Sequence, residues 1–216
     1  MKIILTGASG LIGSRFEELL NESHEIIPLS SEDVDITDPS SVTQFFSNKD
    51  ADVVIHFAGK TDVDGCESDK VNDYLQLNID EFQIENLSIE DLDVYVWKNG
   101  KSAFAVNTVG TLNLYKASKE KGIKFIYIST DFVFKGESEY DENSTPSPVN
   151  WYGMTKYLGE IREIKDEEEI QKIKIAVNKT RETLNKIKNE LKEGITEKEV
   201  YLKIKNYFEK SGFELG

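Results

Sequence analysis

The pattern with the clearest chemical meaning is a tyrosine followed four positions later by a lysine. Tyr152 and Lys156 stand in a segment expected to begin a helix, so the phenol and the ammonium lie on one helix face. A neighbouring cation favours the phenolate and makes the phenol a better proton donor to a developing alkoxide. Thr130 follows a predicted strand, and its hydroxyl can hydrogen-bond the carbonyl oxygen that becomes this alkoxide. These three residues are the predicted catalytic set, and they indicate reduction of a carbonyl.

A glycine-rich turn precedes the first predicted helix. Residues 6–13 read Thr-Gly-Ala-Ser-Gly-Leu-Ile-Gly and directly follow a predicted strand, which is the context that a dinucleotide fingerprint requires. Gly7 permits the tight turn, Gly10 lets the backbone approach a pyrophosphate, and Gly13 allows close packing of helix on strand. The helix N-terminus adds unpaired N–H groups and a partial positive charge. The predicted diphosphate contacts are Gly7, Ser9, Gly10, Leu11, Ile12 and Gly13.

The choice between NAD and NADP is made at the end of the second predicted strand. Ser30 and Ser31 stand there, and serines hydrogen-bond a 2′-phosphate without repelling it, but no arginine adjoins them. NADP is therefore permitted without being required, and the predicted cofactor is NADP or NAD. Further cofactor contacts are predicted mainly at the ends of strands, at Asp35, Ile36, Phe57, Ala58, Gly59, Thr61, Ser129, Tyr152 and Lys156.

Short apolar runs alternate with helical patterns through the first 160 residues. This alternation predicts an α/β fold, a doubly wound, Rossmann-like parallel sheet whose ligand lies at the carboxyl ends of the strands, where the strand order reverses. The predicted strands are Lys2–Thr6, Glu25–Leu29, Val53–Phe57 and Phe125–Ser129, and the predicted helices cover Leu11–Asn21, Pro39–Asn48 and Ser102–Glu120.

After Glu160 the composition changes to a helical pattern rich in Lys, Glu and Ile. Apolar residues recur there at spacings of three and four, which predicts a narrow apolar seam on a charged helix. Thr196 and Glu199 form a capping box that begins another helix. We therefore predict an NAD(P)-binding Rossmann domain over 1–160 and a helical hairpin or coiled-coil element over 161–216, which either joins two copies in a homodimer or packs on the sheet. The seam comprises Ile170, Ile173, Val177, Thr180, Leu184, Ile187 and Leu191.

The overall charge argues against several classes of partner. The chain has 216 residues, with 40 acidic against 26 basic side chains and a formal net charge of −14. Such a surface repels nucleic-acid phosphates and anionic lipid, and no stretch approaches the roughly 20 apolar residues of a spanning helix. The single cysteine, Cys66, excludes an intramolecular disulfide and suits a reducing compartment. We expect a cytoplasmic protein without nucleic-acid or membrane partners, in which His24 and His56 do not indicate a metal site.

A set of short motifs accompanies the catalytic set and the glycine-rich turn in a fixed order. These motifs are Asp35-Ile36, Thr61 to Asp64, Cys66-Glu67, Ala105 to Asn107, Ser129 to Phe134 and Pro146 to Gly153. Through them, residues 1–67 and 102–160 resemble the extended short-chain dehydrogenase/reductases, and among these the dTDP-4-dehydrorhamnose reductases.

The resemblance implies hydride transfer from a nicotinamide to the C4 ketone of a nucleotide-linked sugar. Tyr152 would be the acid, Lys156 would hold the nicotinamide ribose and tune Tyr152, and Thr130 would bind the carbonyl. Asn107 would match a helix asparagine that serves either structure or proton relay.

Two features depart from that family. Residues 68–101 form an acidic insertion, which is either a lid over the sugar, a partner-binding surface or a segment that packs its own aromatic residues. After Glu160, the two further strands and the substrate-binding subdomain of the family are not recognisable. Residues 161–216 instead resemble the opening helices of the Xaa-Pro peptidase (creatinase-like) family, without its metal ligands, so peptidase activity is not inferred.

Three functions stay open on these observations. The first is an NAD(P)-dependent reductase of a nucleotide-linked 4-keto sugar. The second is a non-catalytic NAD(P)-binding regulator or scaffold, which the missing substrate half favours. The third is a nucleotide-sugar 4-epimerase or dehydratase, since these enzymes share the Tyr/Lys pair, although Asp131 alone matches the carboxylates of a dehydratase poorly.

Overall fold

Among the residues described by the structure, a computed structural model, four parallel strands form one sheet. They are β1 (Lys2–Thr6), β2 (Glu25–Leu29), β3 (Val53–His56) and β4 (Lys124–Tyr127), in the order β2-β1-β3-β4. Because all four run in parallel, their carboxyl ends meet at one edge, and the strand order reverses between β1 and β3. The structure describes residues 1–79, 84, 100–136, 140, 141, 143–160, 167–192 and 194–210.

The chain divides into two compact units, Met1–Ile161 and Arg162–Gly216. The sheet belongs to the first unit, together with α1 (Leu11–Leu20), α2 (Pro39–Ser47), α3 (Val63–Leu77), α6 (Thr111–Glu120) and α7 (Trp151–Gly159). A π-helix, η1 (Ala105–Gly110), leads into α6, and a single 3₁₀ turn, η2 (Asp131–Val133), follows β4.

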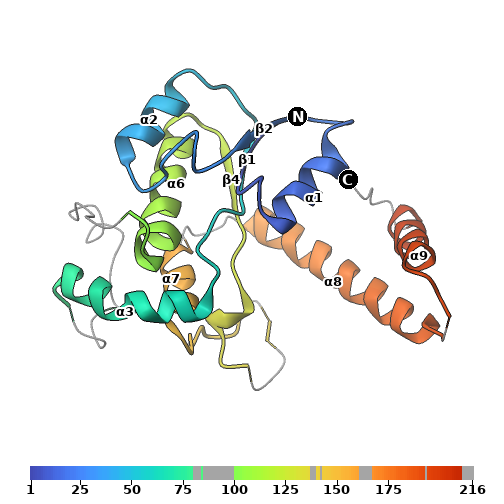
Figure 1. The fold of residues 1–216 in the computed structure, drawn as a ribbon. Helices are drawn as coiled ribbons and strands as arrows, with labels where there is room; N and C mark the ends of the chain where they lie inside the picture. Colours follow the sequence, from blue (N-terminus) through green and yellow to red (C-terminus); the bar gives the residue numbers. More distant parts are fainter. Residues whose placement is uncertain are drawn as a thin grey trace. The chain divides into compact units, whose positions relative to one another are not determined.

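Helices cover both faces of the sheet, which confirms the predicted doubly wound fold. Alternate side chains of β1 point to opposite faces. Leu5 packs with Leu20 of α1 on one face, whereas Ile4 packs with Phe46 of α2 and Leu114 of α6 on the other. Figure 1 shows α1 on one side of the strands and α2 with α6 on the opposite side. Burial of these side chains is the main force that holds the two layers of helices on the sheet.

A third apolar cluster joins α3, the start of η1 and α7. It contains Cys66, Leu77, Phe104, Trp151 and Met154, all buried. Asn150 begins α7 by accepting the backbone N–H of Gly153 at 2.8 Å. This cluster is the packing that positions the helix of the predicted catalytic pair.

The outer strands differ from prediction in burial and extent. Glu25 and Pro28 of β2 are exposed, and Ile126 of β4 is 47% exposed. In the described part of the chain each of these strands pairs on one side only, so their apolar residues meet water. β4 also ends at Tyr127 rather than Ser129, which places Ser129 and Thr130 in the loop beyond the sheet.

Two helical segments also differ from prediction. The structure shows the helix α3 at Val63–Leu77, where none was predicted, so the first part of the predicted insertion 68–101 is helical. Most of the remainder of the insertion lies outside the described residues. The helix predicted at Ser102–Glu120 is present, but it is π-helical over Ala105–Gly110.

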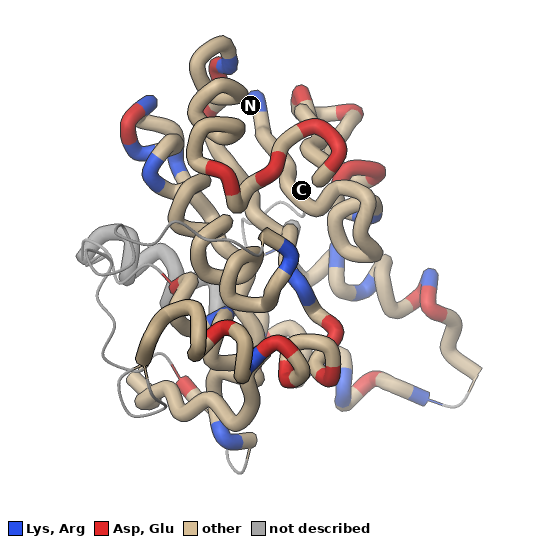
Figure 2. The backbone as a smooth tube through the Cα atoms, turned by 60° about the vertical axis from the view of Figure 1, so that its left-hand side comes forward, with Lys and Arg blue, Asp and Glu red and all other residues tan. Residues whose placement is uncertain are grey.

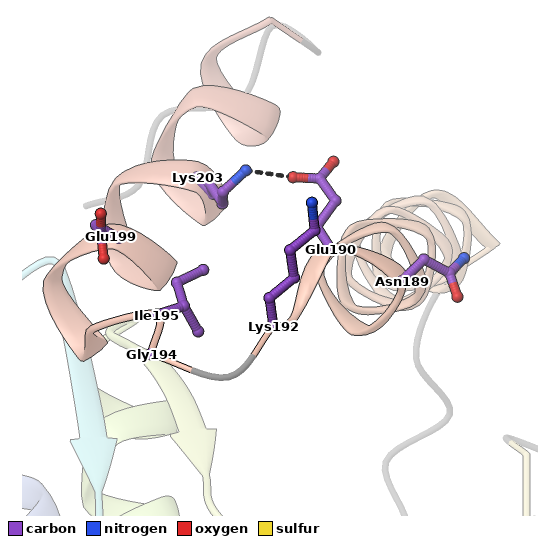
Figure 3. A pocket seen from close by; sticks show the side chains of 7 residues that line it. All are labelled: Asn189, Glu190, Lys192, Gly194, Ile195, Glu199 and Lys203. Carbon is purple, nitrogen blue, oxygen red and sulfur yellow. Dashed lines mark hydrogen bonds and ion pairs between the residues drawn. The ribbon is translucent and has the colours of Figure 1, made fainter.

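The second unit is a pair of helices, α8 (Glu167–Glu190) and α9 (Glu197–Glu209), which confirms the predicted helical hairpin. Glu190 accepts hydrogen bonds from Lys203 and Tyr207 of α9, and these tie the helices together. Figure 3 shows the bond from Lys203. Thr196 and Glu199 form the predicted capping box, since each backbone N–H is bonded to the other side chain. The pocket in Figure 3 contains none of the predicted site residues. The side chains of Ile170, Ile173 and Val177 lie outside those described.

The described residues bear on membranes, metals and charge as follows. None of their helices is long and apolar enough to cross a membrane. No group of three or more His, Cys, Asp or Glu side chains is placed among them to hold a metal ion. Figure 2 shows Lys and Arg positions interspersed with Asp and Glu positions along the described backbone.

Candidate active site

The glycine-rich turn is packed directly against the loop that follows β3. Gly7 has φ +69°, and a Cβ on it would lie 2.6 Å from the backbone nitrogen of Ala58. A Cβ on Gly13 would lie 2.2 Å from the carbonyl oxygen of Gly7. At Gly10 the nearest atom, that same oxygen, would be 3.2 Å away. Side chains are therefore excluded by packing at Gly7 and Gly13, and much less strictly at Gly10.

No side-chain hydrogen bond from the N-cap residue caps the backbone N–H groups at the start of α1. Gly10, the N-cap residue, offers no side chain to accept them. Leu11 and Ile12 are 90% and 62% exposed, so apolar side chains stand in water beside this helix end. Ser9 is also exposed. Four of the predicted diphosphate contacts, Ser9 to Ile12, are therefore exposed beyond the carboxyl end of β1, whereas Gly13 is buried.

A buried histidine connects this region to η1. His56 is fully buried, and its Nδ1 lies 2.6 Å from the Thr6 hydroxyl, while its Nε2 lies 3.0 Å from the Thr111 hydroxyl. Thr6 accepts the backbone N–H of Ala58, and Thr111 donates to the carbonyl of Asn107. Because Thr111 already uses its proton, His56 must donate from Nε2 and accept at Nδ1.

Burial determines the charge state of His56. It lowers the pKa of His56 to about 3, and the neighbouring Lys156 charge adds to the shift. The ring is therefore neutral at physiological pH, and it acts as a structural link between β1, β3 and α6.

Asn107 ties the loop after β3 to α7. It is fully buried and its side-chain oxygen accepts the N–H of Lys60, while its amide donates to the Lys60 carbonyl and to the Thr155 hydroxyl. Thr155 in turn donates to the carbonyl of Tyr152. Both amide protons of Asn107 are thus used within the protein. Of the two roles left open for this residue, the structural one is supported.

Tyr152 and Thr130 lie near each other in the structure. The Tyr152 ring lies edge-on to Phe132 at a centroid distance of 5.7 Å, and the Thr130 hydroxyl donates to the Asp131 carboxylate at 3.2 Å. Burial raises the pKa of Tyr152, and the neighbouring Thr130 hydroxyl opposes this only in part. The net shift is opposite to the one expected from a neighbouring lysine, because Tyr152 is only 9% exposed and a phenolate would be poorly solvated there.

Lys156 is buried, with 4% of its surface exposed. Its ammonium donates to the carbonyl of Ile128 at 2.7 Å and lies 4.1 Å from the centre of the Tyr127 ring. A Cβ on Gly59 would lie 3.9 Å from the same nitrogen, so the loop after β3 passes close by. Burial lowers the pKa of Lys156 to about 8, with Glu160 acting in the opposite sense. Glu160 itself accepts the Ser129 hydroxyl at 2.6 Å.

The predicted cofactor contacts Asp35 and Ile36 have local partners in the structure. Asp35 accepts the backbone N–H and the hydroxyl of Thr37 at 2.9 and 2.7 Å. The carbonyl of Ile36 accepts the side-chain amide of Asn113 on α6. Thr61, a further predicted contact, is exposed just before α3.

Asp33, an acidic residue near the expected position of the ribose 2′-group, was not predicted from the sequence. Asp33 accepts both the N–H and the hydroxyl of Ser30, at 3.0 and 2.6 Å, and these bonds lower the pKa of Asp33. The Ser30 hydroxyl that we expected to be available for a phosphate is therefore bonded to a carboxylate. The spacing of three residues in a turn was the signal that could have identified it.

These features define an α/β protein of Rossmann-like architecture, in which Thr130 and the Lys156 ammonium lie just beyond the carboxyl end of β4. Residues 1–86 and 96–188 match the family model described as the RmlD substrate binding domain, and the chain belongs to that family. The unmatched residues 87–95 lie within the predicted insertion. Because the match continues to residue 188, it reaches well into the second unit, and the resemblance of 161–216 to Xaa-Pro peptidases finds no support.

Three similar proteins illustrate the relationship. The probable low-salt glycan biosynthesis reductase Agl14 of Haloferax volcanii is 33% identical over 175 residues, which cover 74% of this chain and 48% of that protein. The dTDP-4-dehydrorhamnose reductase of Burkholderia thailandensis is 31% identical, with 74% and 45% covered. The crystal structure of dTDP-4-dehydrorhamnose reductase from Bacillus anthracis in complex with NADP has a TM-score of 0.56 at 34% identity, with 74% and 47% covered. The chain spans about half the length of the curated relatives it matches.

The packing of Gly13 predicts a large difference between two alanine substitutions. Gly13→Ala should lower the free energy of unfolding by about 1–3 kcal/mol, because its Cβ would overlap backbone that cannot move away. Gly10→Ala is the control, with a nearest contact of 3.2 Å, and it should change stability much less. Urea unfolding of both variants measures the difference. Equal losses at the two positions would contradict the packing argument.

The burial of Lys156 predicts a pH-dependent stability. The unfolded lysine keeps its proton up to about pH 10.5 and the folded one only to about 8, so the unfolded state binds more protons in that window. Stability should therefore rise with pH between 8 and 10.5, by up to about 3 kcal/mol, relative to a Lys156→Met variant. Urea unfolding of both proteins across this range measures the difference. A difference that stays constant with pH would show that Lys156 is not desolvated.

Proposed function

We propose that this chain is a sugar-nucleotide reductase that uses NADP(H) or NAD(H) and reduces the 4-keto group of a nucleotide-linked sugar. The observation that carries the proposal is the placement of Tyr152. Its phenol lies near the Thr130 hydroxyl, which lowers the pKa of the phenol, and Tyr152 lies on the helix that also delivers Lys156 to the strand ends. Family membership and the reductases among the similar proteins support the same reaction class.

The residues present fit a dinucleotide. The turn after β1 leaves no space for side chains at Gly7 and Gly13, and the helix end beyond it has no side-chain cap from Gly10. Such a turn suits a diphosphate held by backbone N–H groups. When bound, the reduced nicotinamide supplies a hydride. Lys156 would hold the nicotinamide ribose near Gly59, where its ammonium already lies.

The chain's own residues have distinct roles in this proposal. Thr130 hydrogen-bonds the carbonyl oxygen of the sugar, and Tyr152 donates its proton to that oxygen as negative charge develops on it. Lys156 supplies a positive charge on the same helix, which favours loss of the phenol proton in the transition state. Burial keeps Tyr152 protonated until then.

Tyr152→Phe tests the proton-donor role directly. The variant should reduce a dTDP-linked 4-keto sugar about 10²- to 10⁴-fold more slowly, because it lacks the general acid. Its dissociation constant for NADPH should stay nearly unchanged, since the hydroxyl is a minor part of that contact. Tyr157→Phe, which makes the same change in the same helix, is the control and should retain activity. The rate is followed by NADPH absorbance, and equal rates in the chain and in Tyr152→Phe would refute the role.

A non-catalytic regulator or scaffold remains the alternative, because the chain spans about half the length of its curated relatives. The same assay distinguishes the two functions. Saturable NADPH binding without turnover of any nucleotide-linked 4-keto sugar would favour the regulator. Turnover would favour the reductase.

We also propose that the second unit joins two copies of the chain. Leu184 of α8 and Leu191, directly after it, belong to the predicted seam and are 56% and 51% exposed. Replacing both with Glu should convert a dimer to a monomer in light scattering, because charges would face each other across the seam. Ile175→Glu is the control, since Ile175 is 54% exposed but lies off the seam. A chain that is already monomeric, or a dimer that survives the double change, would contradict the proposal.

A further inference from the structure

An acidic side chain of α3 joins the two helical segments that supply Asn107 and Tyr152. Asp73 is 1% exposed, and one of its oxygens, Oδ2, accepts the indole N–H of Trp151 at 2.8 Å and the backbone N–H of Phe104 at 3.2 Å. We propose that Asp73 is a positioning residue: it holds the start of α7 against the start of the η1 helix and thereby sets the place of the Tyr152 phenol. This inference rests on the proposed function of Tyr152.

The hydrogen bonds of Asp73 are needed because its carboxylate is buried. A buried carboxylate is costly unless several donors surround it. Ser102 supplies a third hydrogen bond beside those from Phe104 and Trp151, and burial raises the pKa of Asp73 despite all three. Removing the carboxylate charge would leave these buried donors with a weaker partner.

Other acidic residues of α3 contact one of the two helix starts, and Asp73 contacts both. Asp69 accepts the backbone N–H of Ala103 at 2.7 Å and pairs with Lys60. Glu67 accepts the backbone N–H of Trp151 at 2.9 Å. Carboxylates at helix N-termini accept hydrogen bonds from free N–H groups and interact favourably with the positive end of the helix dipole. Asp73 adds the link between the two starts that Asp69 and Glu67 do not make.

Trp151 transmits this link because it directly precedes Tyr152. Its indole is 1% exposed and packs edge-on against Tyr74 of α3 at 4.9 Å and nearly parallel to Phe104 at 6.4 Å. A rigid ring that packs on Tyr74 and Phe104 and is bonded at its N–H leaves little freedom to the next residue. The position of the Tyr152 phenol therefore depends on the Asp73–Trp151 bond.

Two spectroscopic probes test the inference in the full chain. The chain has two tryptophans, so Trp97→Phe leaves Trp151 as the single indole emitter. Replacing its nine tyrosines with 3-fluorotyrosine gives ¹⁹F resonances, and the one that Tyr152→Phe removes belongs to residue 152. In this background Asp73→Asn should shift both the Trp151 emission and the ¹⁹F resonance of residue 152, and should lower the pKa of that phenol as its burial loosens.

Asp69→Asn is the matched control, since it removes a carboxylate from the same helix and the same η1 start without contacting Trp151. It should leave both signals in place, and Trp151→Phe should shift the ¹⁹F resonance as Asp73→Asn does. Equal effects of Asp69→Asn and Asp73→Asn would overturn the inference, as would an unchanged resonance in Asp73→Asn. NADPH titration of the parent protein is separate: absence of binding there would refute the proposed function and leave the two probe signals to decide the role of Asp73.

Discussion

Two backbone turns, one after β1 and one after β3, are packed so closely that no side chain fits between them, and the rest of the site depends on this contact. The Cβ position of Gly7 lies 2.6 Å from the nitrogen of Ala58. His56, one residue before the second turn, is bonded to the last residue of β1 and to α6. The contact places backbone N–H groups, the small residue Gly59 and the Lys156 ammonium along one edge of the sheet.

Three polar residues of the site, Lys156, Asn107 and Thr155, are buried. The Lys156 ammonium is bonded to a main-chain carbonyl and lies over an aromatic ring, so a charge with little access to water is stabilised by dipoles that are already in place. Asn107 and Thr155 satisfy each other and the surrounding backbone in the same way. Such a preorganised surface suits a reaction in which charge develops on one oxygen and is met by fixed donors.

The sequence pattern predicted the four strands of the sheet and the helices α1, α2 and α6, because periodicity and glycine spacing are local signals. It did not predict that His56 links Thr6 to Thr111 or that Asp73 binds Trp151, since these pairs are about 50 to 80 residues apart and depend on packing. The direction of the Tyr152 pKa was wrong for a related reason. The four-residue spacing suggested that a neighbouring cation sets this pKa, whereas burial, its largest cause, is a property of the folded chain.

The central claim is that a dinucleotide diphosphate binds at the turn after β1, and selective ¹⁵N labelling of glycine tests it most directly. The chain has 14 glycines, so the amide spectrum is simple. Adding NADPH should shift the resonances of Gly7, Gly10, Gly13 and Gly59 in a saturable way and leave Gly122 and Gly194 unchanged. A spectrum in which these four resonances do not move at millimolar NADPH, or in which only Gly122 or Gly194 moves, would contradict the account.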